Sequence, residues 1–439
     1  METKPLDLTL VVPCYNEGPH LRENVVIIRD VLSNTHYRFE LLFVDDKSQD
    51  DTVDHIKDIC SRYPDCRYIL HEKNRGRGAA FKTGFANAKG RVVGFIDVDL
   101  EVHPLSVPYL VSLLDNDSYD VVTGLRYYDT SQIGSLPREI LSRIYRLFVR
   151  MMLGAPLRDT ETGYKFFNAA RSRSVVLGSQ SNGWFWDTEV MARAWLKGLR
   201  VLEFPVLFLR NPGKKSTVRL LPDIAAYMKE LLAFRPKVGL SYWKKSPVFW
   251  SAAGYDFILK LLLGKEYGRI FSEAAALIPE NSSVVDVCCG TGRLYLDFLR
   301  GKKGSYLGLD FNSHFIISLR KKGVNAEFFN LLEEEVPPAD IVVFCSSLMQ
   351  FPSMREEVFQ KLFAAARQAL IISEPVKNIS QHPIKWIGNL ANRMADPGVG
   401  EFRRHFTPQE FADFAERHKA SSIIIKPGNP IALAVFKKK

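Results

Sequence analysis

Short apolar runs rich in β-branched and aromatic residues alternate with longer amphipathic stretches along the first half of the chain. The runs at residues 9–12, 40–44 and 91–96 each end in a polar, acidic cluster. Between them, residues 21–32 and 51–63 carry apolar side chains at helical spacing. Strands that alternate with helices predict a parallel sheet covered on both faces, whose ligands bind at the carboxyl ends of the strands.

The same alternation begins again in the second half, where an apolar helical pattern at residues 255–263 comes first. Six runs there are typical of strands, and the last two predict a terminal β-hairpin: 283–287, 305–309, 341–345, 369–373, 421–426 and 431–436. The chain therefore predicts two α/β domains, each of Rossmann-like type, over residues 1–240 and 266–439. Residues 241–265 are expected to connect them.

Composition supports a folded chain without membrane spans. The 439 residues are 46% hydrophobic and 25% charged, close to globular averages. The longest stretch without Asp, Glu, Lys or Arg covers residues 341–354 and contains Pro352, whereas a membrane-spanning helix needs about 20 apolar residues. The N-terminus lacks the pattern of a secretion signal, and the six sparse cysteines predict neither a disulfide framework nor a zinc site. A cytoplasmic location is expected.

The excess of basic residues is concentrated in two places. Lys and Arg number 59 against 49 Asp and Glu, a net charge of +10. Residues 138–158 contribute +4, and residues 203–245 contribute +6. Such a localised basic surface indicates phosphate, carried by a nucleotide, a lipid head group, a membrane or a nucleic acid.

Three clusters in the first half stand where predicted strands end. VVPCYNE at 11–17 offers the ring of Tyr15 to a base, and the acidic pair in VDD can accept from a base N–H or a ribose hydroxyl. The glycines of NRGRGAA let a loop approach a ligand before the next helix begins. The candidate nucleotide-sugar residues are Pro13, Tyr15, Glu17, Asp45, Asp46, Gly76 and Gly78.

A fourth cluster, FIDVDLE, predicts a metal site. Asp97 and Asp99 alternate with Val98, so both can face one cation at the end of the sheet, and Glu101 is a third oxygen donor. A divalent ion held by one or two carboxylates and a substrate diphosphate suits Mg²⁺ or Mn²⁺, which would neutralise the leaving phosphate. A D-x-D triplet alone is more often a solvated turn. The metal site is favoured here because all four clusters occur in order, each at a predicted strand end.

These four clusters resemble family 2 glycosyltransferases of the GT-A fold. The later blocks DTETGYKFFN, GWFWDTEVMARA and FPVLFLRNPGKKSTVR are similar to the polyprenyl-phosphate branch, which includes dolichol-phosphate mannose synthase and dolichyl-phosphate glucosyltransferase. The resemblance covers about residues 6–235. It implies transfer of a hexose from a nucleotide-diphosphate sugar, of the GDP-mannose or UDP-glucose type, to a polyprenyl phosphate.

The resemblance also implies roles for individual residues. Pro13, Tyr15, Glu17 and Asp46 would bind the nucleoside, and Asp97, Asp99 and Glu101 would bind the metal and the diphosphate. Arg126 would face the sugar or the acceptor phosphate, and a basic set would close over the phosphates: Arg210, Lys214, Lys215 and Arg219. The chain departs from the pattern at Arg77, where Lys is common, and at Glu101, where the mannose synthases carry Gln.

A lipid phosphate is already an anion at neutral pH, so it needs positioning by Arg and Lys more than deprotonation. Asp187 and Glu189 are either bases or structural acids. Contact with the lipid is expected from residues 140–152, where Arg143, Arg146 and Arg150 share one face of a predicted helix. A basic amphipathic helix can lie in a bilayer interface; an ordinary surface helix is the alternative. The expected location is peripheral, at the cytoplasmic face of a membrane.

In the second half, SSVVDVCCGTGRLYLDFL at 282–299 predicts a strand, a tight glycine turn and a helix. Asp310 follows the next strand, where an acid pairs with ribose hydroxyls in doubly wound folds. A dinucleotide site is the rival interpretation, but the glycine pattern is C-C-G-T-G, not G-x-G-x-x-G, and the chain ends in a predicted hairpin.

DVCCGTG resembles motif I of the class I methyltransferases of ubiquinone and menaquinone biosynthesis. Over about residues 266–439 this resemblance implies S-adenosylmethionine as cofactor, held by Asp286, Cys288, Gly290, Gly292, Asp310, Phe311, Asn330, Leu331 and Ser346. The acceptor end would be lined by Ser346, Leu348, Gln350, Glu374 and Pro375, with His382 and His405 as candidate bases.

The leading hypothesis is a bifunctional enzyme, a glycosyltransferase fused to a methyltransferase. A second hypothesis makes the methyltransferase-like domain a non-catalytic binding module. A third, a nucleic-acid-modifying methyltransferase, is disfavoured because the basic excess lies in the first half. No nucleic-acid partner is expected.

Overall fold

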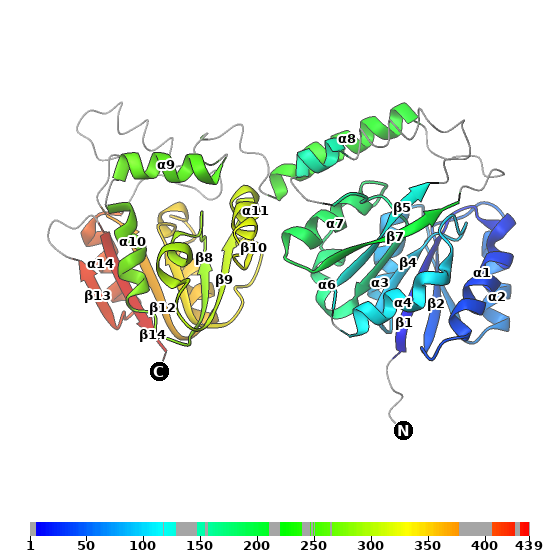
Figure 1. Ribbon diagram of the computed structural model, residues 1–439, viewed down its shortest axis with the longest axis horizontal. Helices are drawn as coiled ribbons and strands as arrows, with labels where there is room; N and C mark the ends of the chain where they lie inside the picture. Colours follow the sequence, from blue (N-terminus) through cyan, green and yellow to red (C-terminus); the bar gives the residue numbers. More distant parts are fainter. Residues whose placement is uncertain are drawn as a thin grey trace, which may run out of the picture. The chain divides into compact units, whose positions relative to one another are not determined.

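In a computed structural model, the chain divides into two compact units, Met1–Phe234 and Arg235–Lys439 (Figure 1). The structure describes residues 6–116, 118–128, 147–153, 157–209, 220–238, 246, 249, 251–263, 266–376, 406–425 and 431–438. Each unit has its own seven-stranded sheet, so the prediction of two α/β domains is confirmed at this level. Among the described residues, no helix has the length and apolar character needed to span a membrane.

The sheet of the first unit has the order β3-β2-β1-β4-β6-β5-β7. Its strands are β1 (Leu6–Cys14), β2 (Phe39–Asp45), β3 (Cys66–Leu70), β4 (Gly90–Ile96), β5 (Val121–Tyr128), β6 (Tyr164–Asn168) and β7 (Val201–Phe208). Strands β3, β2, β1 and β4 are parallel, as predicted. The expectation of a wholly parallel sheet is wrong, because β6 runs antiparallel to both β4 and β5. The segment after Asp159 therefore reaches the carboxyl end of β4.

Helices cover both faces of this sheet. One face packs against α1 (Gly18–Ser33), α2 (Thr52–Arg62) and α4 (Val107–Asp115), which follows the short helix η1 (Pro104–Ser106). Helix α1 shows why: Leu21, Val25, Ile28 and Leu32 recur at helical spacing and are all buried.

The opposite face packs against α3 (Arg77–Ala86), α6 (Ala169–Leu177) and α7 (Trp186–Leu196). The ring of Phe81 on α3 lies 5.0 Å from that of Trp186 and 5.6 Å from that of Phe167. Helix α8 (Leu220–Lys237) joins this side, since the rings of Tyr227 and Phe234 pack edge-to-face with that of Phe185.

The sheet of the second unit has the order β10-β9-β8-β11-β12-β14-β13. Its strands are β8 (Ser283–Val287), β9 (Ser305–Asp310), β10 (Ala326–Phe328), β11 (Ala339–Cys345), β12 (Ala366–Pro375), β13 (Ser422–Ile425) and β14 (Ile431–Lys437). The first five in the order are parallel, and β14 pairs antiparallel with β12 and β13. The predicted terminal hairpin is confirmed. The strand order reverses between β8 and β11, which makes their carboxyl ends the switch point where ligands bind in such folds.

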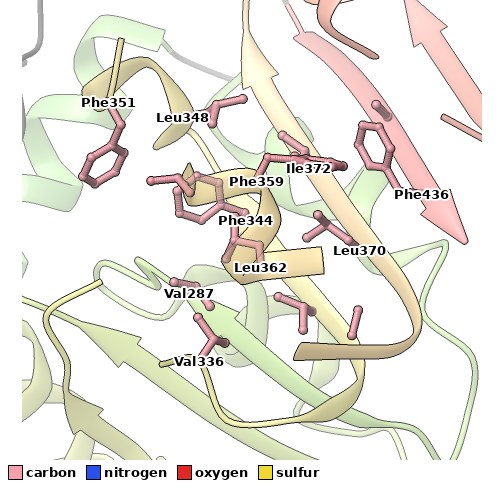
Figure 2. Packing of buried hydrophobic residues seen from close by; sticks show 14 of the residues in the cluster. Val287, Val336, Phe344, Leu348, Phe351, Phe359, Leu362, Leu370, Ile372 and Phe436 are labelled. Atoms are coloured by element: carbon pink, nitrogen blue, oxygen red, sulfur yellow. The ribbon is translucent and has the colours of Figure 1, made fainter. Parts of the chain in front are cut away.

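The helices of the second unit are α9 (Ala252–Leu263), α10 (Glu266–Ala275), the π-helix η4 (Leu294–Leu299), α11 (Ser313–Lys321), η5 (Leu348–Gln350), α12 (Arg355–Ala365) and α14 (Pro408–Arg417). Figure 2 shows the core between α12 and the sheet, where Phe359 and Leu362 meet Phe344, Leu370 and Ile372. Helix α14 begins with a complete capping box, because Thr407 and Glu410 exchange side-chain and backbone hydrogen bonds.

The segment expected to be a connection is partly built into the second unit. The division between the units falls within α8, and Asp256 of α9 accepts a 2.6 Å hydrogen bond from Thr291 in the glycine turn. Asn312 donates to the carbonyl of Phe249 at 2.9 Å. Helix α9 therefore belongs to the edge at which the predicted cofactor residues lie.

Candidate functional site

The first predicted cluster forms the turn after β1. Tyr15 is 45% exposed, so its ring is free to face a planar base. Asn16 adopts a φ of 56°, and the N–H groups of Asn16 and Glu17 donate to Ser48 and Thr52 at 2.9 and 2.8 Å. The loop after β2 thus fixes the turn that holds Tyr15. Pro13 stands opposite Val44 in the β1–β2 register.

The two aspartates at the end of β2 are buried, and their carboxylates accept hydrogen bonds from the chain itself. Asp45 accepts from the N–H groups of Lys47 and Ser48, both at 3.0 Å. Asp46 accepts from the N–H groups of Arg75 and Gly76 at 2.9 and 2.7 Å, and its Oδ1 lies 2.7 Å from His71 Nδ1. These carboxylates shape the two loops beside Tyr15; their contact with a nucleoside stays a prediction.

The glycines of the NRGRGAA loop are explained by packing within the chain. Gly76 has a φ of 95°, and a Cβ on it would lie 2.4 Å from the carbonyl oxygen of Asn182. A Cβ on Gly78 would lie 2.5 Å from Trp186, and the N–H of Gly78 donates to Asn182 at 2.8 Å. Packing against residues 182–186 thus requires glycine at both positions, and the approach of a ligand to this loop stays a prediction.

The Asp97–Asp99 turn follows β4 and is followed directly by a strained residue. Val98 is buried between the two aspartates, while Asp97 keeps 40% of its side chain exposed. Asp99 Oδ1 accepts from the N–H of Glu101 at 3.3 Å, and Leu100 has a φ of 52°. Left-handed non-glycine residues persist mainly where function maintains them. Asp97 Oδ2 accepts a 3.1 Å hydrogen bond from Arg77 Nη2.

The fit of a divalent metal rests on this donor set. The described residues contain no group of three His, Cys, Asp or Glu side chains around one point, so Asp97, Asp99 and Glu101 do not form a complete site by themselves. Two carboxylates on one strand-end turn nevertheless suit Mg²⁺ or Mn²⁺, which bind few protein ligands and complete their shell with phosphate and water. The residues fit the ion in that form.

Both acidic residues of α7 are committed to structural bonds. Asp187 accepts from the ammonium of the buried Lys165 at 2.6 Å. Glu189 accepts from the N–H groups of Gln180 and Ser181 at 2.9 and 2.7 Å, and from Arg193 at 2.7 Å. Of the two predicted roles, base or structural acid, these contacts favour the second.

Arg126 is held by a residue that the sequence did not single out. Its Nε and Nη2 donate to the two carboxylate oxygens of Asp159 at 2.7 and 2.8 Å. Burial opposes the charge of Arg126, but Asp159 raises its pKa. The pair is therefore ionised and fixed, with Arg126 one residue before the exposed Tyr127.

Several predicted residues fall outside the described part of the chain: Arg210, Lys214, Lys215, Arg219, His382 and His405. Of the predicted amphipathic segment, residues 140–152, the part from 147 onward lies in a described helix at 147–153, whereas Arg143 and Arg146 fall outside the described residues. Leu147, Arg150 and Met151 are exposed there, whereas Val149 and Leu153 are buried.

In the second unit, the glycine turn after β8 is tied to the end of β9. The N–H of Gly290 donates to Asp310 Oδ2 at 2.8 Å, and Asn312 donates to Oδ1 at 2.7 Å. A Cβ on Gly290 would meet no described atom within 4 Å, whereas one on Gly292 would lie 2.4 Å from Leu319. Among the described residues, Gly290 thus faces open space, and Gly292 packs on α11. Burial raises the pKa of Asp310 to about 6.

The remaining predicted cofactor residues line the same edge. Phe311 packs on Phe328 with ring centroids 5.3 Å apart. Asn330 Oδ1 accepts from the N–H of Leu332 at 3.2 Å, and Leu331 is buried. Asp286 lies deeper, where it accepts from Tyr306 at 2.8 Å; burial raises the pKa of Asp286 to about 7.

Two strained residues flank the switch point of this sheet. Cys288 follows β8 with a φ of 56°, and Ser346 follows β11 with a φ of 53°. Behind them, Glu374 at the end of β12 accepts from the N–H groups of Ser347 and Leu348 at 2.8 and 2.7 Å. Burial raises the pKa of Glu374 to about 7. Glu374 thus supports the turn after β11.

Sequence reasoning missed Asp159 and Lys165 and treated Arg77 as a departure from a pattern. The available signal was the lysine in YKFFN, a charge inside an otherwise apolar strand. A charge in such a place requires a buried partner.

Comparison with known proteins supports the prediction of a glycosyltransferase domain in the first unit. Residues 9–176 match the family model described as "Glycosyl transferase family 2". The chain is 29% identical over 231 residues to "Glycosyltransferase AglD" of Haloferax volcanii, a match that covers 52% of this chain and 36% of that protein. It is 26% identical over 251 residues to "Dolichyl-phosphate beta-glucosyltransferase" of Saccharomyces cerevisiae, covering 52% of this chain and 74% of the yeast protein.

A third relative, "Putative glycosyltransferase CsbB" of Bacillus subtilis, is 27% identical over 175 residues, 40% of this chain and 52% of the relative. The match thus spans about a third of the length of the Haloferax protein and about half of the length of the Bacillus protein. Glucosyl-3-phosphoglycerate synthase from Mycobacterium tuberculosis, solved with Mn²⁺, UDP-glucose and phosphoglyceric acid, aligns with a TM-score of 0.41 and 22% identity over 54% of this chain and 81% of that one.

Proposed function

We propose that residues 9–176, which match the family model described as "Glycosyl transferase family 2", form a glycosyltransferase domain of the GT-A fold, and that the first unit transfers a hexose from a nucleotide-diphosphate sugar to a polyprenyl phosphate. The similarity to a dolichyl-phosphate β-glucosyltransferase supports the lipid phosphate as acceptor. GDP-mannose and UDP-glucose are the candidate donor types.

The observation that best supports a phosphate acceptor is the set of hydrogen bonds that the carboxylates of Asp187 and Glu189 accept. A hydroxyl acceptor needs a carboxylate or imidazole within reach to take its proton. Both α7 carboxylates are instead buried and occupied by Lys165, Arg193 and backbone N–H groups. An acceptor that arrives as a phosphate anion needs no such base, and this agrees with the chemistry of a lipid phosphate.

At the donor end, each described residue has one task. Tyr15 would offer its ring to the base, and Asp97 and Asp99 would hold the Mg²⁺ or Mn²⁺ that accompanies the diphosphate. The metal supplies charge neutralisation for the departing nucleoside diphosphate. Arg126, fixed by Asp159, presents a permanent cation to the sugar or the acceptor phosphate. Arg210, Lys214, Lys215 and Arg219 are proposed to close over the phosphates.

For the second unit we propose S-adenosylmethionine binding and methyl transfer. The support is the open space at Gly290, the half-buried Asp310 that joins the glycine turn to β9, and the strained Cys288 and Ser346 at the switch point. The sulfonium would supply an activated methyl group, so the chain's residues would need mainly to position donor and acceptor in line. A non-catalytic binding module is the second candidate, because the same turn could bind the cofactor without an acceptor.

Contact with a membrane is part of this proposal. The exposed Leu147, Arg150 and Met151 on the helix at 147–153 support peripheral binding at the cytoplasmic face.

The deciding experiment incubates the purified chain with polyprenyl phosphate, Mg²⁺ or Mn²⁺ and a panel of GDP- and UDP-hexoses, with and without S-adenosylmethionine. Lipid products are identified by mass spectrometry. Asp99→Asn is expected to lower glycolipid formation by at least about 100-fold, because one metal ligand loses its charge, while Asp310→Ala retains it. Full activity of Asp99→Asn would refute the metal assignment. A wild-type chain that forms no glycolipid with any donor would refute the acceptor.

A further inference from the structure

A chain of four alternating charges runs from the core of the first unit to its Asp97–Asp99 turn. It begins at Lys165 on β6, which stands opposite Phe95 in the β4–β6 register. The Lys165 side chain is 0% exposed, and its ammonium donates to Asp187 Oδ1 at 2.6 Å and to the carbonyl of Thr162. Burial lowers the pKa of Lys165 and Asp187 opposes that change. The ammonium is tolerated only because these acceptors surround it.

Asp187 connects Lys165 to the next charged residue, Arg77. The Asp187 side chain is 2% exposed and lies in the first turn of α7, where the helix N-terminus favours a carboxylate. Its Oδ2 lies 3.6 Å from Arg77 Nε, a buried N–H that has no hydrogen-bond acceptor among the described residues. Arg77 Nη2 donates to Asp97 Oδ2 at 3.1 Å. The guanidinium therefore lies between a buried carboxylate and the exposed one of the turn.

The surroundings of Arg77 restrict its position further. Its guanidinium carbon lies 4.7 Å from the ring centre of Phe95 and 5.3 Å from that of Trp184. A Cβ on Gly163 would lie 1.8 Å from Asp97 Oδ2 and 2.3 Å from Arg77 Nη2, so the pair needs glycine at this position. Burial opposes the charge, yet Asp97, Asp187 and Asp99 raise the pKa of Arg77. Arg77 is therefore a permanent cation beside both proposed metal ligands.

We propose that Lys165 and Asp187 are positioning residues that hold Arg77 as the counter-ion of Asp97, and that Arg77 yields Asp97 to the divalent metal and turns its Nη2 to the donor diphosphate. The inference rests on the proposed function. Of the described ionic contacts of Arg77, the one from Nη2 to Asp97 breaks in this exchange, while Asp187 holds the other side of the guanidinium. An arginine fork suits phosphate oxygens, which are strong acceptors.

The counter-ion role is tested by titrating the nucleotide-free full chain with Mn²⁺, with free Mn²⁺ followed by electron paramagnetic resonance. Arg77→Gln removes a cation that competes with the metal, so Mn²⁺ should bind about fivefold more tightly. Arg77→Lys keeps the charge and should bind Mn²⁺ within about twofold of wild type. Unchanged or weaker binding in Arg77→Gln would overturn the proposal, as would a wild-type chain that binds no Mn²⁺.

The positioning role is tested with the double variant Lys165→Met, Asp187→Leu, which replaces the buried ion pair with apolar side chains of similar volume. Calorimetric titration of GDP and UDP in the presence of Mn²⁺ should show about tenfold weaker binding, because Arg77 is no longer held toward the diphosphate. Nucleotide affinity equal to wild type in a folded variant would mean that the pair is merely structural.

The matched control is Glu189→Gln, which changes a second buried carboxylate of α7 that bonds Arg193 rather than Arg77. It should lower thermal stability while nucleotide and Mn²⁺ affinities stay within about twofold of wild type, since it leaves Arg77 untouched. A loss equal to that of the double variant would overturn the proposal. These binding measurements need no acceptor, so they separate this inference from the proposed lipid product: absence of glycolipid refutes the acceptor and leaves the counter-ion test intact.

Discussion

Buried carboxylates in this chain differ in how many donors they receive. Asp45 and Asp46 in the first unit each accept several N–H hydrogen bonds. Asp286 in the second unit lies equally deep, with Tyr306 as its hydrogen-bond donor at 2.8 Å. Burial without a cation penalises the charged form. Asp286 should therefore make the stability of the second unit depend on pH.

The sign follows from linkage. The pKa of Asp286 is about 7 in the folded chain against 3.8 ordinarily, so the folded state holds the proton more tightly. Its contribution to stability is fully present below about pH 4 and is lost as pH rises to about 7. Asp286→Asn cannot ionise and should flatten this part of the curve, by roughly 4 kcal/mol between the two limits. Denaturant unfolding across pH 4–8 measures the difference.

Asp340→Asn is the matched control. Hydrogen bonds from Ser283 lower the pKa of Asp340, so its contribution is present at neutral pH and lost as pH falls below its ordinary value. This variant should therefore lose stability at neutral pH relative to low pH, the opposite trend. Parallel curves for wild type and Asp286→Asn would show that Asp286 is solvated.

At single residues, the sequence located the site better than it described the bonds. Tyr15, Asp97 and Asp99 lie at strand ends as predicted, because a polar residue after an apolar run marks such an end. The partner of Asp46 could not be predicted: it accepts from Arg75 and Gly76, about thirty positions later. Such a partner depends on where a loop returns in three dimensions, which no local pattern encodes.

Among the elements, two helical glycines allow the effect of packing on stability to be measured separately from that of helix propensity. Gly78 in α3 has Trp186 2.5 Å from where its Cβ would be, whereas Gly268 in α10 has no described atom within 4 Å. Gly78→Ala should therefore destabilise the first unit by about 1–3 kcal/mol through overpacking. Gly268→Ala should stabilise the second by about 0.5–1 kcal/mol, because alanine loses less backbone entropy in a helix. Calorimetric unfolding of both variants gives the comparison; a stabilising Gly78→Ala would mean that α3 can move away from α7.

The hydrophobic periodicity of the sequence predicts where strands lie but not their direction in the sheet. The pattern predicted β1, β2 and β4 and the six strands expected in the second unit, but it did not predict β3, β5, β6, β7 or the three-residue β10, nor that β6 is antiparallel. Strand direction depends on how the chain returns to the sheet, and a three-residue run carries too little periodicity to detect. The role of α9 was also missed, since its apolar pattern does not reveal that Asp256 reaches Thr291.

For the whole molecule, the two units have separate sheets and separate hydrophobic cores. Units with separate cores can unfold separately, and a ligand at about 100 times its dissociation constant adds about 2.7 kcal/mol to the stability of the unit that binds it. Calorimetry of the full chain should therefore show two transitions. GDP or UDP with Mn²⁺ should raise the temperature of one transition by several degrees, and S-adenosylmethionine should raise that of the other.

Asp99→Asn should abolish the nucleotide shift and keep the S-adenosylmethionine shift, while Asp310→Ala should do the reverse. A nucleotide that shifts both transitions equally would show that the units are energetically coupled, and a chain on which S-adenosylmethionine has no effect would remove the cofactor from the proposal for the second unit.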